Sequence, residues 1–137
     1  MGGDASLADV PLRRRTRTDP LPRVREICLS LPESTERASH GAPTWFVREK
    51  TSFVTYADDH HGDGRLALWC AAPAGMQRGL VKADPEHYFV PPYVGYRGWV
   101  GVHLDKGLDR DAIARAIEEA YVTVAPKKLV SILKGPA

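Results

Sequence analysis

The spacing of hydrophobic residues changes several times along this chain of 137 residues, and each change marks a predicted element. From Pro20 to Leu31, apolar residues recur every three or four positions, which predicts an amphipathic helix over 20–31. Asp19 stands at the expected N-cap, before a proline in the first turn. Pro32 ends this helix, because the residue before a proline avoids the helical region.

Three runs rich in aromatic and β-branched residues follow, and this composition is typical of β-strands. They cover residues 44–48, 51–56 and 65–70. The first two are close enough for a tight hairpin, and a polar loop over 57–64 leads to the third. Residues 32–43 contain two prolines and a glycine, so we expect an irregular connector there.

The second half of the chain predicts a helix from Pro73 to Asp84, an aromatic loop and a final long helix between Asp109 and Pro126. Short strands are expected on either side of the loop, over 87–89 and 99–104. Residues 127–133 are expected to form a short helical tail. This order predicts a two-layer α+β fold. We expect an antiparallel sheet of about five strands, with three helices packed on one face and the other face open.

Charge separates the first 18 residues from the rest. Residues 1–18 contain four Arg and two Asp, so residues 19–137 hold 15 Lys or Arg and 15 Asp or Glu. We expect residues 1–18 to be a flexible Arg-rich tail and residues 19–137 to be a single domain. Nucleic-acid-binding domains usually have a basic face, and a neutral domain weakens that interpretation.

The two cysteines, Cys28 and Cys70, fall in predicted elements and are interpreted as small buried hydrophobes, with a disulfide as the less favoured alternative. Free thiols fit the reducing cytoplasm. No apolar run approaches the roughly 20 residues of a membrane span, and the N-terminus lacks the apolar core of a signal peptide. We therefore expect a cytoplasmic protein with no membrane contact.

Six short stretches together point to a known family. They are Leu-Pro-Glu at 31–33, Ser-His-Gly-Ala-Pro-Thr-Trp at 39–45, Arg-Leu-Ala-Leu-Trp at 65–69, Phe-Val-Pro-Pro-Tyr-Val-Gly at 89–95, Gly-Trp-Val-Gly-Val at 98–102 and Ala-Pro-Lys-Lys-Leu at 125–129. With them the chain resembles the MmcQ/YjbR family of small bacterial proteins. The resemblance implies a fold similar to secretion chaperones and frataxin, and DNA binding through a double wing of β-hairpins. It brings no catalytic residues, so we expect a non-enzymatic binding protein.

Basic residues at the predicted hairpin tips, in the aromatic loop and near the C-terminus are the candidates for contacts with DNA phosphates. They are Arg48, Lys50, Arg65, Arg97, Lys127 and Lys128. The 57–64 loop also contains Asp58, Asp59 and Asp63, which would repel phosphate. An ordinary solvated turn is therefore the alternative for that tip.

Aromatic residues are the candidates for a ligand or partner surface. They are His40, Trp45, Tyr93, Tyr96 and Trp99. Such rings could stack on the bases of single-stranded nucleic acid, or they could belong to the core. Two alternatives to DNA binding use the open sheet face and the loop over 89–99: a protein-interaction or chaperone-like module, and a small-molecule binder with a pocket beneath the loop. We expect a monomer or a weak dimer.

No cofactor, metal or catalytic residue is predicted. His60 and His61, with the aspartates of their loop, could hold a divalent ion loosely. However, adjacent histidines rarely ligate one metal, and the spacing matches neither a zinc site nor a calcium loop. Ser39, His40 and Cys70 are potential reactive groups, but no orienting acid can be placed beside them.

Overall fold

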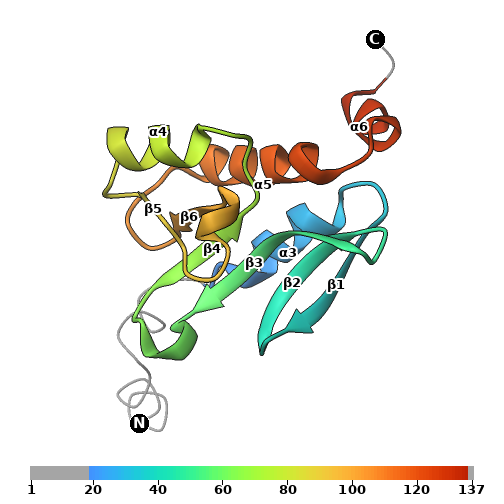
Figure 1. Cartoon of the computed structure of the whole chain (residues 1–137). Helices are drawn as coiled ribbons and strands as arrows, with labels where there is room; N and C mark the ends of the chain where they lie inside the picture. Colours follow the sequence, from blue (N-terminus) through green and yellow to red (C-terminus); the bar gives the residue numbers. More distant parts are fainter. Residues whose placement is uncertain (1–18, 136–137) are drawn as a thin grey trace, which may run out of the picture.

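The computed structural model describes residues 19–135, so the predicted tail at 1–18 lies outside the described residues (Figure 1). One antiparallel sheet of six strands has the order β1-β2-β3-β4-β6-β5. Its strands are β1 (Ser34–Ser39), β2 (Ala42–Val47), β3 (Thr51–Asp58), β4 (Leu66–Cys70), β5 (Tyr88–Phe89) and β6 (Val100–His103). The helices are α3 (Leu21–Leu29), α4 (Met76–Ala83), α5 (Arg110–Val124) and α6 (Lys127–Lys134), with short 3-10 turns η1 (His60–Gly62) and η2 (Gly95–Arg97). Within residues 19–135, no helix combines the length and the apolar character needed to cross a membrane.

The predicted two-layer α+β fold is confirmed. The sheet has one strand more than the expected five, and α6 corresponds to the helical tail predicted over 127–133, beside the three expected helices. The connector expected over 32–43 is wrong, because residues 34–39 form the edge strand β1. Its polar sequence has little intrinsic strand preference. The strand is held by its pairing with β2 across the turn His40-Gly41, where both residues have positive φ, 52° and 80°, as two-residue hairpin turns require.

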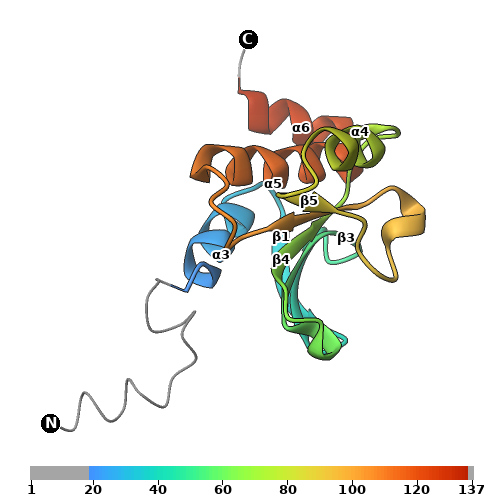
Figure 2. The ribbon, with the colours of Figure 1, turned by 90° about the vertical axis from the view of Figure 1, so that its left-hand side faces the viewer.

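The side of the sheet toward α3 and α5 contains most of the core. In Figure 2 both helices lie on the same side of the strands. Phe53 packs edge-to-face on Tyr121 of α5, with ring centroids 5.5 Å apart. A bulge between β2 and β3 leaves Phe53 without a partner in the register, and both Phe53 and Val54 are fully buried. Leu129 joins this core and attaches α6 to it.

A charged network on this side ties α3 to the edge of the sheet. The carboxylate of Glu36 on β1 accepts two hydrogen bonds from Arg25 of α3, at 2.8 and 2.9 Å. It accepts a third from the indole nitrogen of Trp45 on β2, at 3.1 Å. The hydrogen bond from Arg25 is the main reason that the pKa of Glu36 lies below its usual value.

The loop between β5 and β6 projects from the other side of the sheet, away from α3 (Figure 2). Gln77 of α4 holds it by donating a hydrogen bond of 2.8 Å to the carbonyl of Gly95. Gly101 makes room for a ring, because a Cβ there would lie 2.4 Å from the ring of Phe89. Gly98 serves the turn instead, since its φ is 86°.

Both cysteines are free and buried, in agreement with the interpretation as small hydrophobes. Burial raises the pKa of the Cys28 thiol and that of Cys70. Neither side chain is therefore a thiolate at neutral pH.

Candidate functional site

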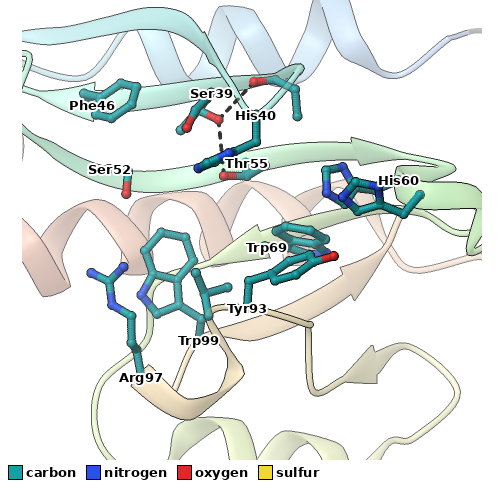
Figure 3. Close-up of a pocket in the computed structure, with 14 residues that line it drawn as sticks. Ser39, His40, Phe46, Ser52, Thr55, His60, Trp69, Tyr93, Arg97 and Trp99 are labelled. Atoms are coloured by element: carbon teal, nitrogen blue, oxygen red, sulfur yellow. Dashed lines mark hydrogen bonds between the residues drawn. The ribbon is translucent and has the colours of Figure 1, made fainter.

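The open face of the sheet forms one wall of a cavity of about 440 Å³, which we call the open-face cavity (Figure 3). The loop between β5 and β6 forms the opposite wall, and the loop after β3 closes one end. The residues that line it are Ser39, His40, Ala42, Thr44, Phe46, Ser52, Thr55, His60, His61, Trp69, Tyr93, Val94, Arg97 and Trp99. They come from five separate segments, so only the folded chain assembles the site.

Four rings cluster at one end of the cavity. His60 packs against the indole of Trp69, with centroids 5.0 Å apart, and against Tyr93, at 5.9 Å. His61 lies 5.9 Å from the same tyrosine ring. Trp69 and Tyr93 are themselves 6.1 Å apart. Tyr93 is 64% exposed and has a φ of 66°, a conformation that is uncommon for a bulky residue.

The loop that presents these histidines is shaped by two aspartates. Asp59 accepts a 2.7 Å hydrogen bond from the amide of Gly64, and Asp63 accepts one of 2.9 Å from the amide of Arg65. These carboxylates thus satisfy backbone donors inside the turn. Asp59 and Asp63 therefore stabilise the loop that carries the two histidines.

The other end of the cavity combines rings with guanidinium groups. The Arg97 guanidinium lies over the ring of Trp99, 5.2 Å from its centroid. Across the cavity, Phe46 is covered by Arg37 at 3.7 Å. Figure 3 shows Arg97 and Trp99 facing Phe46 and Ser52, with the four-ring cluster further along. The two ends together form an aromatic slot with a cationic margin.

Hydroxyl groups line the sheet wall between the two ends. Thr44 donates to the carbonyl of Ala42 at 3.1 Å, and its hydroxyl lies 3.3 Å from that of Thr55. The indole N–H of Trp69 is different. It is buried and has no hydrogen-bond partner among residues 19–135. Buried polar groups are nearly always paired, so this donor needs an explanation.

The charge of the cavity lining is entirely basic. Arg97 and three histidines contribute to it, and no Asp or Glu among the described residues lines it. Burial is the main reason that the pKa of His60 lies below its usual value, and the neighbouring His61 lowers it further. The site therefore offers a permanent cation, Arg97, and one histidine, His60, that gains charge as pH falls.

The structure does not bring the six expected DNA contacts together. Arg48 and Lys50 lie in the turn before β3, whereas Arg65 follows its other end. An eight-residue strand separates them, a span of about 25 Å. Arg48 pairs with Glu33 at 3.1 Å. Lys127 and Lys128 begin α6, outside the cavity.

Arg65 and Arg97 line two cavities that share part of their lining. A second cavity of about 340 Å³ shares His60, His61 and Tyr93 with the first and has Arg65 in its lining. Arg65 also lies over the ring of Phe89, 4.2 Å from its centroid. These two arginines thus occupy two adjoining cavities on the open face.

The expected aromatic surface is partly assembled. His40, Tyr93 and Trp99 line the cavity, and Tyr96 is 88% exposed beside it without lining it. Trp45 does not belong to this surface. It is completely buried on the opposite side of the sheet, where Glu36 accepts its N–H.

Sequence analysis missed Phe46, Thr44 and Thr55 as lining residues. Side chains alternate along a strand, so a buried Trp45 places Phe46 and Thr44 on the opposite face. The cross-strand pairing of Thr44 with Thr55 then adds the third. The alternation of side chains can be read from the sequence, but the sequence does not show which face of the sheet the helices cover.

One group of potential metal ligands exists among the described residues, away from the open-face cavity. It comprises Asp84, Glu86 and His87, whose ligand atoms lie within 4.8 Å of one another. The Nδ1 atom of His87 is 2.9 Å from Asp84, and its Nε2 atom is 2.9 Å from the carbonyl of Lys106. Both ring nitrogens therefore already connect α4 to the segment after β6.

Fold and cavity together define a class of small α+β protein in which helices cover one face of an antiparallel sheet and an aromatic loop overhangs the other. The chain belongs to the YjbR family, which it matches over residues 29–123. It is similar to the crystal structure of Deinococcus radiodurans protein DR2400, which has a DUF419 domain. That similarity has a TM-score of 0.66 at 20% identity and covers 85% of this chain and 88% of the other. No curated protein matches the chain.

Proposed function

We propose that this protein binds a small molecule in the open-face cavity. The main observation in support is the cavity itself, which has about 440 Å³ of space between aromatic walls and a few polar groups. Ligand sites are typically concave, largely apolar and within this range of size. A sheet face that bound a flat protein surface would not require a loop that overhangs it.

Binding without catalysis fits the chemistry of the lining. No carboxylate among the described residues lines the cavity, so none is placed there to orient a histidine as a general base. Burial raises the pKa of both cysteine thiols, which makes them poor nucleophiles. The free thiols also favour the cytoplasm as the compartment in which the protein works.

Two fluorescent dyes with the same ring system test the proposal. They are the anionic 8-anilinonaphthalene-1-sulfonate and the neutral N-phenyl-1-naphthylamine, and both brighten in apolar sites. We expect saturable binding of at least one dye at one site per chain. Replacing Tyr93 with alanine should weaken binding, because its ring forms part of the cavity wall.

Tyr96→Ala is the matched control, because Tyr96 belongs to the same loop but lies outside the lining. It should bind the dye as the unchanged chain does. If neither dye binds, or if both tyrosine variants bind equally well, the proposed function is wrong.

Nucleic acid is the second candidate ligand, in keeping with the DNA-binding role that the family resemblance implies. The observation that favours it is the position of Arg65 and Arg97 in adjoining cavities that share Tyr93. This arrangement suits a single strand whose bases stack on exposed rings while its phosphates meet arginines.

Titrations at about 50 mM and 200 mM salt would test this second candidate. If each arginine contacts one phosphate of a single strand, replacing both with alanine should reduce the log–log salt slope by about 1.4. A duplex bound through the hairpin wings would instead depend on Arg48 and Lys50. No salt-sensitive binding of either nucleic acid would exclude this candidate.

A further inference from the structure

The cations of this domain differ in whether a carboxylate neutralises them. Arg25 is paired with Glu36, and Arg48 with Glu33. Arg97 forms no ion pair with any of the described residues, although it points into the open-face cavity (Figure 3). The central carbon of its guanidinium lies 5.2 Å from the centroid of the Trp99 ring, and a cation–π contact of this kind uses none of its N–H donors.

Other positive groups reinforce this charge. Arg37 pairs in register with Thr44, so both stand on the open face of the sheet. Its guanidinium covers Phe46, which lines the cavity. The three histidines of the lining add to the positive charge when they are protonated. Residues 19–137 have equal numbers of acidic and basic groups, so an all-basic lining is a local concentration of charge.

The indole N–H of Trp69 is a second, independent observation. Trp69 is only 5% exposed and lines the cavity, and its nitrogen has no partner in the part of the chain that the structure describes. The rings of His60 and Tyr93 pack around this indole. A buried donor without a partner costs free energy, and an acceptor on a ligand would remove that cost.

We propose that the open-face cavity recognises an anion attached to a planar ring, such as an aromatic carboxylate or a nucleotide phosphate. This inference rests on the proposed function and specifies its ligand. The ring lies in the slot between Trp99, Phe46 and the four-ring cluster. The anionic group meets Arg97, and a shift of the rings of His60 and Tyr93, which cover the indole nitrogen of Trp69, lets an acceptor atom of the ligand reach it.

Comparison of the two dyes tests the charge preference directly, because they share a ring system and differ in the sulfonate. We expect the anionic dye to bind about tenfold more tightly than the neutral one. Arg97→Gln should remove most of this preference by weakening only the anionic dye. Arg110→Gln removes one positive charge outside the cavity and should leave both affinities unchanged.

The possible results separate this inference from the proposed function. If both dyes bind equally and Tyr93→Ala weakens both, a small-molecule site exists but its preference for anions is wrong. If Arg97→Gln and Arg110→Gln reduce anionic binding to the same extent, the preference reflects overall charge and the inference also fails.

Two pairs of competitors then distinguish the sources of the anion. Benzoate and benzamide form one pair, and adenosine 5′-monophosphate and adenosine form the other. Displacement of the anionic dye by the charged member alone supports the inference and identifies the class of ligand. Equal displacement by charged and neutral members would overturn it.

Discussion

Trp45 and Trp69 stand on opposite faces of the same sheet, and their indole nitrogens are in opposite situations. On the face covered by α3, Trp45 donates to Glu36 at 3.1 Å. On the open face, Trp69 is nearly as deeply buried, but no described residue accepts a hydrogen bond from its N–H. The indole N–H of the first residue is hydrogen-bonded, as expected in a core, whereas that of the second is an unused donor beneath the rings that line the cavity.

The arginines repeat this contrast. Arg25, on the helix side, makes a bidentate pair with Glu36, whereas Arg97 on the open side contacts the ring of Trp99 and forms no ion pair with a described residue. A face that serves stability satisfies its polar groups within the chain. A face that leaves both a donor and a cation unsatisfied has the properties of a binding site.

The same substitution on both faces should give the largest difference. Trp45→Phe and Trp69→Phe remove the same atoms, but only the first breaks a hydrogen bond to a charged group. We expect Trp45→Phe to lower the free energy of unfolding by about 1.5–3 kcal/mol more than Trp69→Phe. Urea unfolding of both variants measures this. Equal losses would mean that the two indoles contribute alike to stability.

Gly101 marks a position on the open side of the sheet where an aromatic ring already fills the space beside the backbone. It pairs in register with Trp69, yet the ring of Phe89 lies where its Cβ would be, at 2.4 Å. Gly101→Ala should therefore cost about 1–3 kcal/mol through overpacking. Gly79→Ala is the control, because its Cβ meets nothing within 4 Å and the helical position should gain about 0.4–1 kcal/mol. A neutral Gly101→Ala would show that Phe89 moves aside readily.

The network on the covered face should make stability depend on acid. The folded-state pKa of Glu36 is lowered, chiefly by its hydrogen bond from Arg25, so its contribution is present above the unfolded pKa of about 4.3. That contribution is lost as pH falls through the folded pKa. Glu36→Gln should cost about 1 kcal/mol at pH 7, a modest value because Arg25 is partly exposed.

Unfolding measured at about pH 7 and pH 3 checks this prediction. The difference between the unchanged chain and Glu36→Gln should shrink at the lower pH, because protonation of Glu36 removes the charge that distinguishes it from glutamine. A difference that stays constant would mean that the charge of Glu36 has no role.

The open face should show a smaller pH effect, in binding. His60 faces His61, Trp69 and Tyr93, and its charge also interacts with Asp63 and His40. Burial lowers its pKa, so it is neutral at pH 8. A bound sulfonate favours its protonated form, and affinity for the anionic dye should rise a few-fold as pH falls below the usual histidine pKa of about 6.5.

His60→Gln should flatten this pH profile, whereas His87→Gln, outside the cavity, should not. The neutral dye provides a second comparison, since its affinity should stay constant over the same pH range. Equal pH dependence for the two dyes would assign the effect to a change in the cavity rather than to charge.

Local sequence patterns determined the elements that consist of strongly periodic or strongly β-forming residues. The helix that ends before Pro32 and the aromatic run around Trp45 were predictable, because backbone preferences and side-chain alternation act over a few residues. The family resemblance covered nearly the whole domain and is confirmed by the match over 29–123. The polar strand β1 was not predictable, because its pairing with β2, rather than its own composition, makes it a strand.

Only the tertiary structure decided which aromatic residues form the site. Trp45 and Trp69 both lie in predicted strands, but α3 covers the first while the loop with Tyr93 overhangs the second. Likewise, β3 separates Arg48 from Arg65 by its full length, although both belong to predicted hairpin tips. Covering a face and closing a cavity depend on contacts between distant segments, and the periodicity of one segment contains no information about its partner.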